Sequence, residues 1–314
     1  MALEPQEGKG SIFVTGGTGL VGKRIVSRLR QLGYCVLVLS RGNLMEGLES
    51  VEVISGDITN GKLLEEAVSG CDAIIHCAAE LKDVNKMYEI NVVGTRNVYE
   101  AARKNRVRYF CHLSSVGVIG RTNQRVVDEQ TPCDPINPYE RTKWEAEQIV
   151  EKGIEGCSSV ILRPTNVFAE EIISPDSYRG IGSAVKVWLT GKERSHLIYA
   201  ADVVEAAIYL RENCAHDGCE KFIVSSDEEP GGASGDVYDA VRQLLGYRVT
   251  KRRFTCPVEL AYYLRLLRYG HANRGDVCYS ARRLLRTGFK IPFGWFEGIR
   301  RCVEFNQHRV KMVS

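Results

Sequence analysis

The sequence predicts an α/β fold, in which a doubly wound parallel sheet is followed by a smaller C-terminal portion. Short apolar runs alternate with longer helical patterns through the first half of the chain, and this alternation indicates βαβ units. A glycine-rich turn directly follows the first apolar run. The 314 residues, 44% hydrophobic and 26% charged, are enough to bury a sizeable core, which excludes a disordered or fibrous chain.

The first half of the chain supplies most of the expected sheet. Runs rich in Val, Ile and Leu predict strands at residues 11–15, 35–40, 51–55, 73–76, 109–114 and 159–163. Each is apolar through its middle, as in strands that are buried on both faces. Helical patterns lie between them at 22–32, 63–68, 91–105 and 139–152. These stretches are long enough to cross over and return the chain parallel, which predicts a doubly wound sheet.

The second half has a looser pattern. It predicts strands at 196–199 and 221–225, and helices at 185–189, 236–245 and 257–269. We therefore expect a sheet domain at residues 1–164. A smaller portion at 165–314 is expected to be interleaved with the last strands of the sheet.

The charge is unevenly distributed along the chain. The formal net charge is +3, yet residues 251–314 contain 14 Lys and Arg against 4 acids, a net of +10, which leaves −7 for residues 1–250. A basic segment of this kind can contact phosphates, nucleic acid or an anionic membrane surface, and Arg-rich helix faces in solvent are an equal alternative. No nucleic-acid-binding module is recognisable, so no nucleic-acid partner is expected.

Several function classes are excluded by what the chain lacks. No apolar run approaches the roughly 18 residues that a membrane span needs, so no membrane-spanning helix is expected. The first ten residues lack the basic start and apolar middle of a secretory signal, which predicts a cytoplasmic protein. The eleven cysteines are odd in number and several lie in strand-like runs, so reduced core thiols are expected. Cys214, His216 and Cys219 have no second cluster to complete a metal site.

The glycine-rich turn at residues 14–22 predicts a phosphate-binding loop. Gly16 permits a tight turn, Gly19 lets the backbone approach a pyrophosphate, and Gly22 lets the helix pack close to the strand. The amides at the start of the helix would then face the phosphates. A dinucleotide cofactor is therefore expected here.

The end of the second expected strand bears on which dinucleotide binds. An acid there would bond the adenosine ribose of NAD, whereas a basic residue would accept the 2′-phosphate of NADP. The sequence has Ser40 and Arg41 at this point. This favours NADP, with NAD as the alternative.

Tyr139 and Lys143 are candidates for proton transfer. They are four residues apart, which places them on one face of an expected helix. A phenol has an unperturbed pKa near 10, so proton transfer at neutral pH needs a nearby cation, and Lys143 is placed to supply one. Ser115 follows an expected strand, where ligands of α/β proteins bind, and its hydroxyl can orient the oxygen of a substrate.

These residues belong to a longer series of motifs. The others are Gly-Asp at 56–57, His-Cys-Ala-Ala at 76–79, Asn-Val-Val-Gly-Thr at 91–95, Arg-Pro-Thr-Asn-Val-Phe at 163–168 and Ala-Asp-Val-Val-Glu-Ala at 201–206. Together they resemble the extended short-chain dehydrogenases/reductases, especially the NAD-dependent epimerase/dehydratase group, over nearly the whole chain. The resemblance implies a Rossmann domain at 1–164 and a substrate-binding portion at 165–314.

The resemblance also implies roles for particular residues. Asp57 would lie against the adenine, and Leu20, Ile58 and Ala78 would contact the cofactor. Asn91 would order the active site, in which Ser115, Tyr139 and Lys143 perform hydride-transfer chemistry, and Lys143 would also hold the nicotinamide ribose. Asn166 and Arg194, with Ser115, are expected to contact the substrate. Taken alone, Asn91 could equally cap a helix and Asp57 a turn.

The expected function is hydride transfer at a secondary alcohol or ketone by an NAD(P)-dependent oxidoreductase or epimerase. A nucleotide-sugar is the first choice of substrate, because residues 163–166 resemble sugar-nucleotide members and the basic tail could bind a pyrophosphate. Ile119, however, stands where many of those members have a tyrosine. A reductase of sterol-like or flavonol-like alcohols is the alternative, since residues 254–265 resemble a helix of such members. A non-catalytic NADP-sensing protein is the alternative from another class, and a homodimer is expected from the family.

Overall fold

The computed structural model of the chain describes residues 9–42, 51–171, 178, 181–249, 255–269 and 273–313. Residues 1–8, on which the expectation of no secretory signal largely rests, lie outside the described residues. None of the helices within these ranges is long and apolar enough to cross a membrane.

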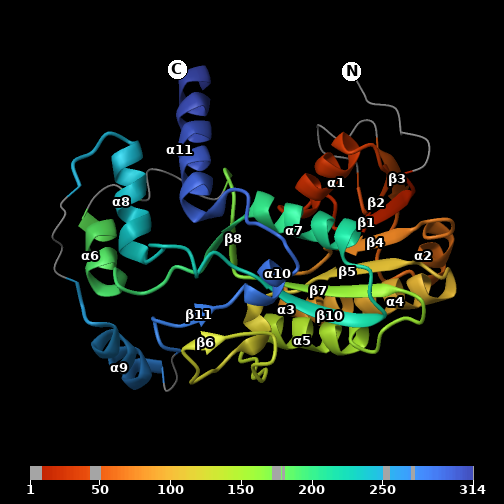
Figure 1. Ribbon diagram of the computed structural model, residues 1–314, viewed down its shortest axis with the longest axis horizontal. Coiled ribbons are helices and arrows are strands. Elements are labelled where there is room, and N and C mark those ends of the chain that lie inside the picture. Colours follow the sequence, from red (N-terminus) through yellow and green to blue (C-terminus); the bar gives the residue numbers. More distant parts are fainter. Residues whose placement is uncertain are drawn as a thin grey trace. The chain divides into compact units, whose positions relative to one another are not determined.

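A seven-stranded sheet forms the centre of the first part of the chain (Figure 1). Its order is β3-β2-β1-β4-β5-β7-β10. The strands are β1 (Ser11–Thr15), β2 (Cys35–Ser40), β3 (Glu52–Ser55), β4 (Ala73–His76), β5 (Tyr109–Leu113), β7 (Ser158–Pro164) and β10 (Gly218–Val224). The neighbours from β3 to β7 pair in parallel. The chain reverses its direction of winding between β1 and β4, so the predicted doubly wound α/β fold is confirmed.

Helices cover both faces of this sheet. Figure 1 shows α1 (Gly22–Gln31) and α7 (Ala200–Asn213) on one face, and α4 (Gly94–Lys104) and α5 (Pro138–Val150) on the other. The helix α2 (Gly61–Ala67) packs beside α4. The core between α2, α4, α5 and the sheet includes Phe13, Leu64, Ile74, Val98, Phe110, Val150 and Ile161. Burying these apolar side chains is the main force that holds the helices on the sheet.

One expected helix is divided differently from the prediction. The pattern at 91–105 was expected to form one α-helix, but α4 is preceded by α3 (Val84–Met87) and a π-helical turn at Tyr88–Val93. The apolar periodicity continues through the wider turn, so the sequence does not mark it. Such turns are frequent at functional sites, and this one contains Asn91.

The chain divides into two compact units. One comprises Met1–Gly120, Cys133–Arg163 and Val203–Phe222, and the other comprises Arg121–Pro132, Pro164–Asp202 and Ile223–Ser314. The second unit contains two parallel strand pairs, β6 (Val126–Val127) with β11 (Cys278–Tyr279) and β8 (Asn166–Phe168) with β9 (Leu197–Tyr199). Its helices are α6 (Ile181–Thr190), α8 (Ser234–Leu244), α9 (Val258–Tyr269), α10 (Arg282–Arg286) and α11 (Gly294–Val313).

The helix α11 was not predicted, although the sequence contains a signal for it. Trp295, Ile299, Cys302 and Val303 are buried in one cluster with Val241 of α8. Their spacing of three and four residues is that of a helix face. Charged residues occupy many of the other positions of α11, and they obscure this pattern in the sequence.

Arg163 and Glu147 form a buried ion pair in the first unit. Their side chains are 1% and 0% exposed, and Arg163 Nε donates to Glu147 Oε1 at 3.0 Å. The pair joins β7 to α5. Arg163 opens the Arg-Pro-Thr-Asn motif, so the first residue of this motif has a structural partner on the neighbouring helix.

Candidate active site

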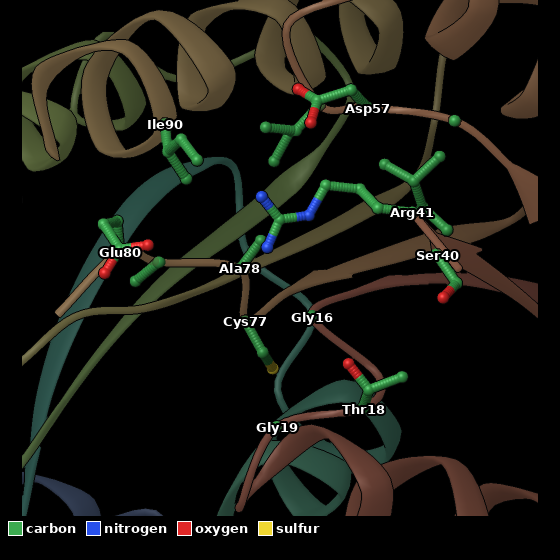
Figure 2. A pocket seen from close by; sticks show the side chains of 14 residues that line it. Gly16, Thr18, Gly19, Ser40, Arg41, Asp57, Cys77, Ala78, Glu80 and Ile90 are labelled. Carbon is green, nitrogen blue, oxygen red and sulfur yellow. The ribbon is translucent and has the colours of Figure 1, made fainter. Parts of the chain in front are cut away.

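A pocket opens at the carboxyl ends of β1, β2, β3 and β4, all in the first unit. It holds about 700 Å³ of empty space, part of it open to solvent, and it lies where the strand order reverses. Figure 2 shows several of its lining residues. The full lining is Gly16, Thr18, Gly19, Leu39, Ser40, Arg41, Gly56, Asp57, Ile58, Cys77, Ala78, Ala79, Glu80 and Ile90.

The glycine turn has no room for side chains at two of its predicted positions. Gly16 has a φ of +67°, and a Cβ there would lie 2.6 Å from the amide nitrogen of Ala78. A Cβ on Gly22 would lie 2.1 Å from the carbonyl oxygen of Gly16. The turn therefore keeps its backbone bare and close to β4, which is the arrangement a pyrophosphate needs. These features fit a dinucleotide.

Of the predicted cofactor residues, Gly16, Gly19, Arg41, Asp57, Ile58 and Ala78 line the pocket. Leu20, Gly22 and Lys143 are not in its lining. Gly22 instead allows the tight approach to Gly16 within the turn. The contacts that these residues would make with a cofactor stay predictions.

Asp57 is held as a carboxylate at the end of β3. It accepts hydrogen bonds from the backbone N–H of Thr59 at 2.9 Å and from its hydroxyl at 2.8 Å. The backbone bond is the largest cause that lowers the pKa of Asp57, and the charge of Arg41 adds to it. Figure 2 shows the Arg41 guanidinium extending into the pocket near Asp57 and Ala78.

Two further side chains of the pocket were not predicted. Glu80 follows β4, and its Oε1 accepts hydrogen bonds from the backbone N–H groups of residues 81–83. These bonds lower the pKa of Glu80. Ile90 comes from the π-helical turn. Neither residue belongs to one of the sequence motifs, and only the folded turns bring them to the pocket.

Tyr139 lies in the first turn of α5, which begins at Pro138 and is capped by Asn137. Burial is the largest cause that raises the pKa of Tyr139 to about 12, and the Ser115 side chain lowers it in part. The predicted role of Ser115, to orient the oxygen of a substrate, stays a prediction. The expected lowering of the phenol pKa by Lys143 is not found: burial and the charge of Glu140 raise this pKa, and Lys143 is not among the groups that shift it.

Lys143 is buried one helical turn later. Its Nζ donates to the carbonyl oxygen of Leu113 at 2.6 Å and lies 3.2 Å from Nε2 of His112. Burial lowers the pKa of Lys143 to about 8, while the carboxylate of Glu147 opposes the shift. The side chain is thus close to the point where its ammonium form is lost at physiological pH.

Two histidines lie behind Lys143, at the ends of neighbouring strands. His76 pairs with His112 in the β4–β5 register, and their ring centroids are 5.0 Å apart. His76 is hydrogen-bonded through both ring nitrogens, to Thr15 at 2.7 Å and to Thr95 at 2.8 Å. Burial lowers the pKa of His76 to about 3, so the ring is neutral. Its two hydrogen bonds connect buried side chains inside the domain.

His112 differs from His76 because one ring nitrogen has no partner. Its Nε2 faces the Lys143 ammonium, whereas its buried Nδ1 makes no hydrogen bond. Burial and the Lys143 charge hold the pKa of His112 well below its ordinary value. The network therefore assigns the neutral tautomer with the proton on Nδ1, which leaves Nε2 as an acceptor. His112 was not singled out in the sequence, although a histidine just before the Ser-Ser pair was visible.

Asn91 connects the π-helical turn to α5 and to the pocket rim. Its Nδ2 donates to the Glu80 carbonyl and to the Thr142 hydroxyl, both at 3.0 Å, and its Oδ1 accepts from the Glu80 N–H at 2.7 Å. Two of these bonds hold the backbone of Glu80 and the third holds the Thr142 side chain on α5. Thr142, which the sequence did not indicate, lies between Tyr139 and Lys143 in the chain.

The other predicted substrate residues, Asn166 and Arg194, belong to the second unit. Asn166 Nδ2 donates to the carbonyl of Ser195 at 2.9 Å. Arg194 bonds to the carbonyl of Asp227 and lies beside a shallow depression in that unit, which Ser195 and Trp295 also line. Ile119, the departure from sugar-nucleotide members, is fully buried, so its side chain packs in the interior.

Comparisons with known proteins support the same family. The model of the NAD dependent epimerase/dehydratase family matches residues 12–224. N-acetyl-alpha-D-glucosaminyl-diphospho-ditrans,octacis-undecaprenol 4-epimerase of Escherichia coli is 31% identical, over 94% of this chain and 95% of the relative. Sterol-4-alpha-carboxylate 3-dehydrogenase, decarboxylating, of Dictyostelium discoideum is 34% identical over 43% of each chain.

Solved structures resemble the chain over nearly its whole length. A short-chain dehydrogenase/reductase superfamily protein from Agrobacterium tumefaciens with bound NAD has a TM-score of 0.76 at 21% identity, over 96% of this chain and 99% of its own. UDP-glucose 4-epimerase of Thermotoga maritima with UDP-glucose has a TM-score of 0.71 at 20% identity, over 96% and 99%. At these identities the likeness shows the fold. With the family model and the full-length relative, it identifies the chain as a member of the NAD-dependent epimerase/dehydratase family of extended short-chain dehydrogenases/reductases.

Proposed function

We propose that this protein transfers a hydride between a nicotinamide cofactor and a secondary alcohol or ketone carbon of a nucleotide-sugar or related diphosphate-linked sugar. The observation that carries the proposal is the position of Tyr139 in the first turn of α5, where the Ser115 side chain acts on its phenol, with the buried Lys143 one turn further along the same helix. These residues belong to the same compact unit as the glycine-lined pocket.

The side chains of the site divide the proton chemistry between them. A bound nicotinamide ring would accept or give the hydride, and the reacting alcohol oxygen would exchange its proton with the Tyr139 hydroxyl. Ser115 orients that oxygen. A pKa of about 12 keeps Tyr139 protonated at neutral pH, which suits proton donation to a carbonyl oxygen. Proton uptake needs added positive charge, and the Lys143 ammonium is the side chain that supplies it.

NADP is the proposed cofactor, and the supporting observation is Arg41. This residue and Ser40 line the pocket at the end of β2, and Figure 2 shows the guanidinium within it. Asp57 and Glu80 are the acids of the lining, and both lie beyond other strands. The similar structure from Agrobacterium tumefaciens binds NAD, so NAD is the alternative that a binding measurement must separate.

Replacing Arg41 with Ala should weaken NADP binding by about ten- to a hundredfold, because a charge-assisted bond to the 2′-phosphate is lost. NAD binding should change little. Titration calorimetry with both dinucleotides measures the difference. The matched control is Arg103→Ala, since Arg103 lies on α4 outside the pocket lining and pairs with Glu100 at the surface. Equal losses for NAD and NADP in Arg41→Ala would contradict the assignment.

His112 is expected to set the pH range of turnover through Lys143. Its Nε2 accepts from the ammonium, so His112→Leu removes a bond that favours the charged form. The pKa of Lys143, about 8 in the native protein, should fall by roughly one to two pH units. Because the lysine stabilises the phenolate only when charged, the alkaline fall in turnover should shift down by the same amount.

His112→Gln is the control for this prediction, because its amide oxygen keeps an acceptor near the lysine. Turnover against pH should follow the native profile in His112→Gln and be displaced in His112→Leu. Superimposed profiles for the native protein and His112→Leu would show that the histidine does not act through Lys143.

A panel of UDP-, GDP- and dTDP-sugars tests the substrate class. A ligand at one hundred times its Kd adds about 2.7 kcal/mol to the free energy of unfolding, so a true substrate should raise the thermal midpoint of the cofactor-loaded protein. A shift with any of these sugars supports the proposal. Shifts only with sterol-like or flavonol-like alcohols would favour the second candidate, which rests on the partial match to the Dictyostelium discoideum relative.

The other expectations remain predictions. A non-catalytic NADP sensor has no need for the Ser115, Tyr139 and Lys143 set, which counts against that alternative. A homodimer through the helices near 91–105 and 139–152, a cytoplasmic location, and a division into cofactor-binding residues 1–164 and substrate-binding residues 165–314 each await their own measurement.

A further inference from the structure

The helix α9 presents a row of large apolar side chains to solvent. Leu260, Tyr263, Leu264 and Leu267 are 51%, 59%, 51% and 84% exposed. Their spacing of three, four and seven residues places them on one face of the helix. An exposed contiguous apolar face commonly marks an interaction site, and a single exposed leucine would not.

The opposite face of α9 is the one that packs against the second unit. Among the side chains of this helix that the structure describes, Ala261 is buried and Val258, Tyr262 and Leu266 are half-buried. The exposed face therefore adds four large apolar side chains that the described part of the second unit does not cover.

The helix α6 lies beside α9 and carries more exposed apolar area. The backbone N–H of Cys256, just before α9, donates to the carbonyl of Trp188 near the end of α6 at 2.8 Å. On α6, Val185, Trp188 and Leu189 are 51%, 44% and 38% exposed. Tryptophan is enriched where proteins meet the headgroup region of a bilayer.

The sequence around α9 is strongly basic. Between Arg248 and Arg274 there are seven Lys and Arg against one acid, a net of +6. That acid, Glu259, lies 3.6 Å from Arg274 in an ion pair. Apolar residues on one face of a helix within a basic sequence are the combination that binds anionic membrane surfaces. A second copy of the chain would instead bring like charges together, which disfavours self-association through this face.

We propose that the exposed face of α9, formed by Leu260, Tyr263, Leu264 and Leu267, docks the protein on an anionic membrane surface. The apolar side chains enter the boundary between headgroups and acyl chains, and the surrounding basic residues attract anionic lipid. The docking is peripheral and needs neither cofactor nor substrate, so it is independent of the proposed function. It would place the enzyme next to substrates carried by lipids.

Co-sedimentation of the full-length protein with vesicles tests this proposal. The native protein should sediment with phosphatidylglycerol vesicles and much less with phosphatidylcholine vesicles, and salt should weaken the binding. The double variant Leu264→Asp with Leu267→Asp should bind roughly tenfold or more weakly. The matched control is Val126→Asp with Phe305→Asp, which makes the same charge change at residues 56% and 43% exposed on other elements of the same unit. It should bind nearly as the native protein does.

Three results would overturn the proposal. The native protein could stay in the supernatant with both vesicle types, or the α9 double variant could bind as well as the control. The protein could also form a dimer in solution that the α9 variant dissociates, which would assign the face to a second copy. Thermal unfolding of both variants confirms that they fold. None of these outcomes depends on substrate binding, so the test stays valid even if the proposed function is wrong.

Discussion

Tyr139→Phe should lower turnover by about 10²–10⁴-fold while leaving cofactor affinity unchanged. The phenol is the group placed to exchange a proton with the reacting oxygen, and the Ser115 side chain lowers its pKa. Removing the hydroxyl leaves the pocket at the ends of β1 to β4 untouched, since Tyr139 is not part of its lining. Steady-state turnover and cofactor titration together measure the two effects.

Tyr99→Phe provides the matched control for this loss. Its hydroxyl donates to the Gly153 carbonyl at 2.6 Å in the interior of the first unit. The variant should be less stable by about 1 kcal/mol but should turn over normally. If Tyr139→Phe turns over as fast as Tyr99→Phe, the proton-transfer role belongs to another group and the proposed mechanism fails.

Glu147→Ala should destabilise the protein by about 3–5 kcal/mol, because it leaves the guanidinium of Arg163 buried without a counter-charge. Both partners are within 1% of complete burial. The same carboxylate raises the pKa of Lys143, so the variant should also lose the ammonium form at lower pH. Urea unfolding measures the first effect and the pH profile of turnover the second.

A surface ion pair on the neighbouring residues serves as the control. Glu151, at the end of α5, pairs with Lys221 at 3.0 Å, and each side chain is 30% exposed. Glu151→Ala should cost only about 0–1 kcal/mol, since solvent screens the pair. Similar losses in Glu147→Ala and Glu151→Ala would mean that burial does not distinguish the two pairs.

Much of the fold could be predicted because buried parallel strands read as continuous apolar runs. The strand expected at 35–40 forms as β2 at Cys35–Ser40, and the one at 73–76 forms as β4 at Ala73–His76. The helix ends were also signalled, as Asn137 and Pro138 show at the start of α5. The strand expected at 196–199 forms as β9, but the weaker periodicity of the second half hid α11 and the short strands β6, β8 and β11. The pairing of such short strands depends on contacts distant in the sequence.

The parts of the site that could be predicted are those whose functional residues lie close together in the sequence. The glycine turn lies within one loop, and Tyr139 and Lys143 lie one turn apart on α5, so motifs reveal them. The partners of Arg163 and Lys143 depend on packing between α5 and the strands, which spacing does not show. The buried Glu147 and His112 are therefore found only in the folded protein.

The protonation state of the Cys77 thiol affects how well alkylating reagents can report access to the pocket. It lines the pocket, and Figure 2 shows its sulfur beside the glycine turn. Burial raises its pKa to about 12, so almost no thiolate exists at neutral pH, and the thiolate is the form that alkylating reagents attack. Slow labelling of this cysteine by iodoacetamide would therefore be expected even when the pocket is open, and such footprinting would under-report its accessibility.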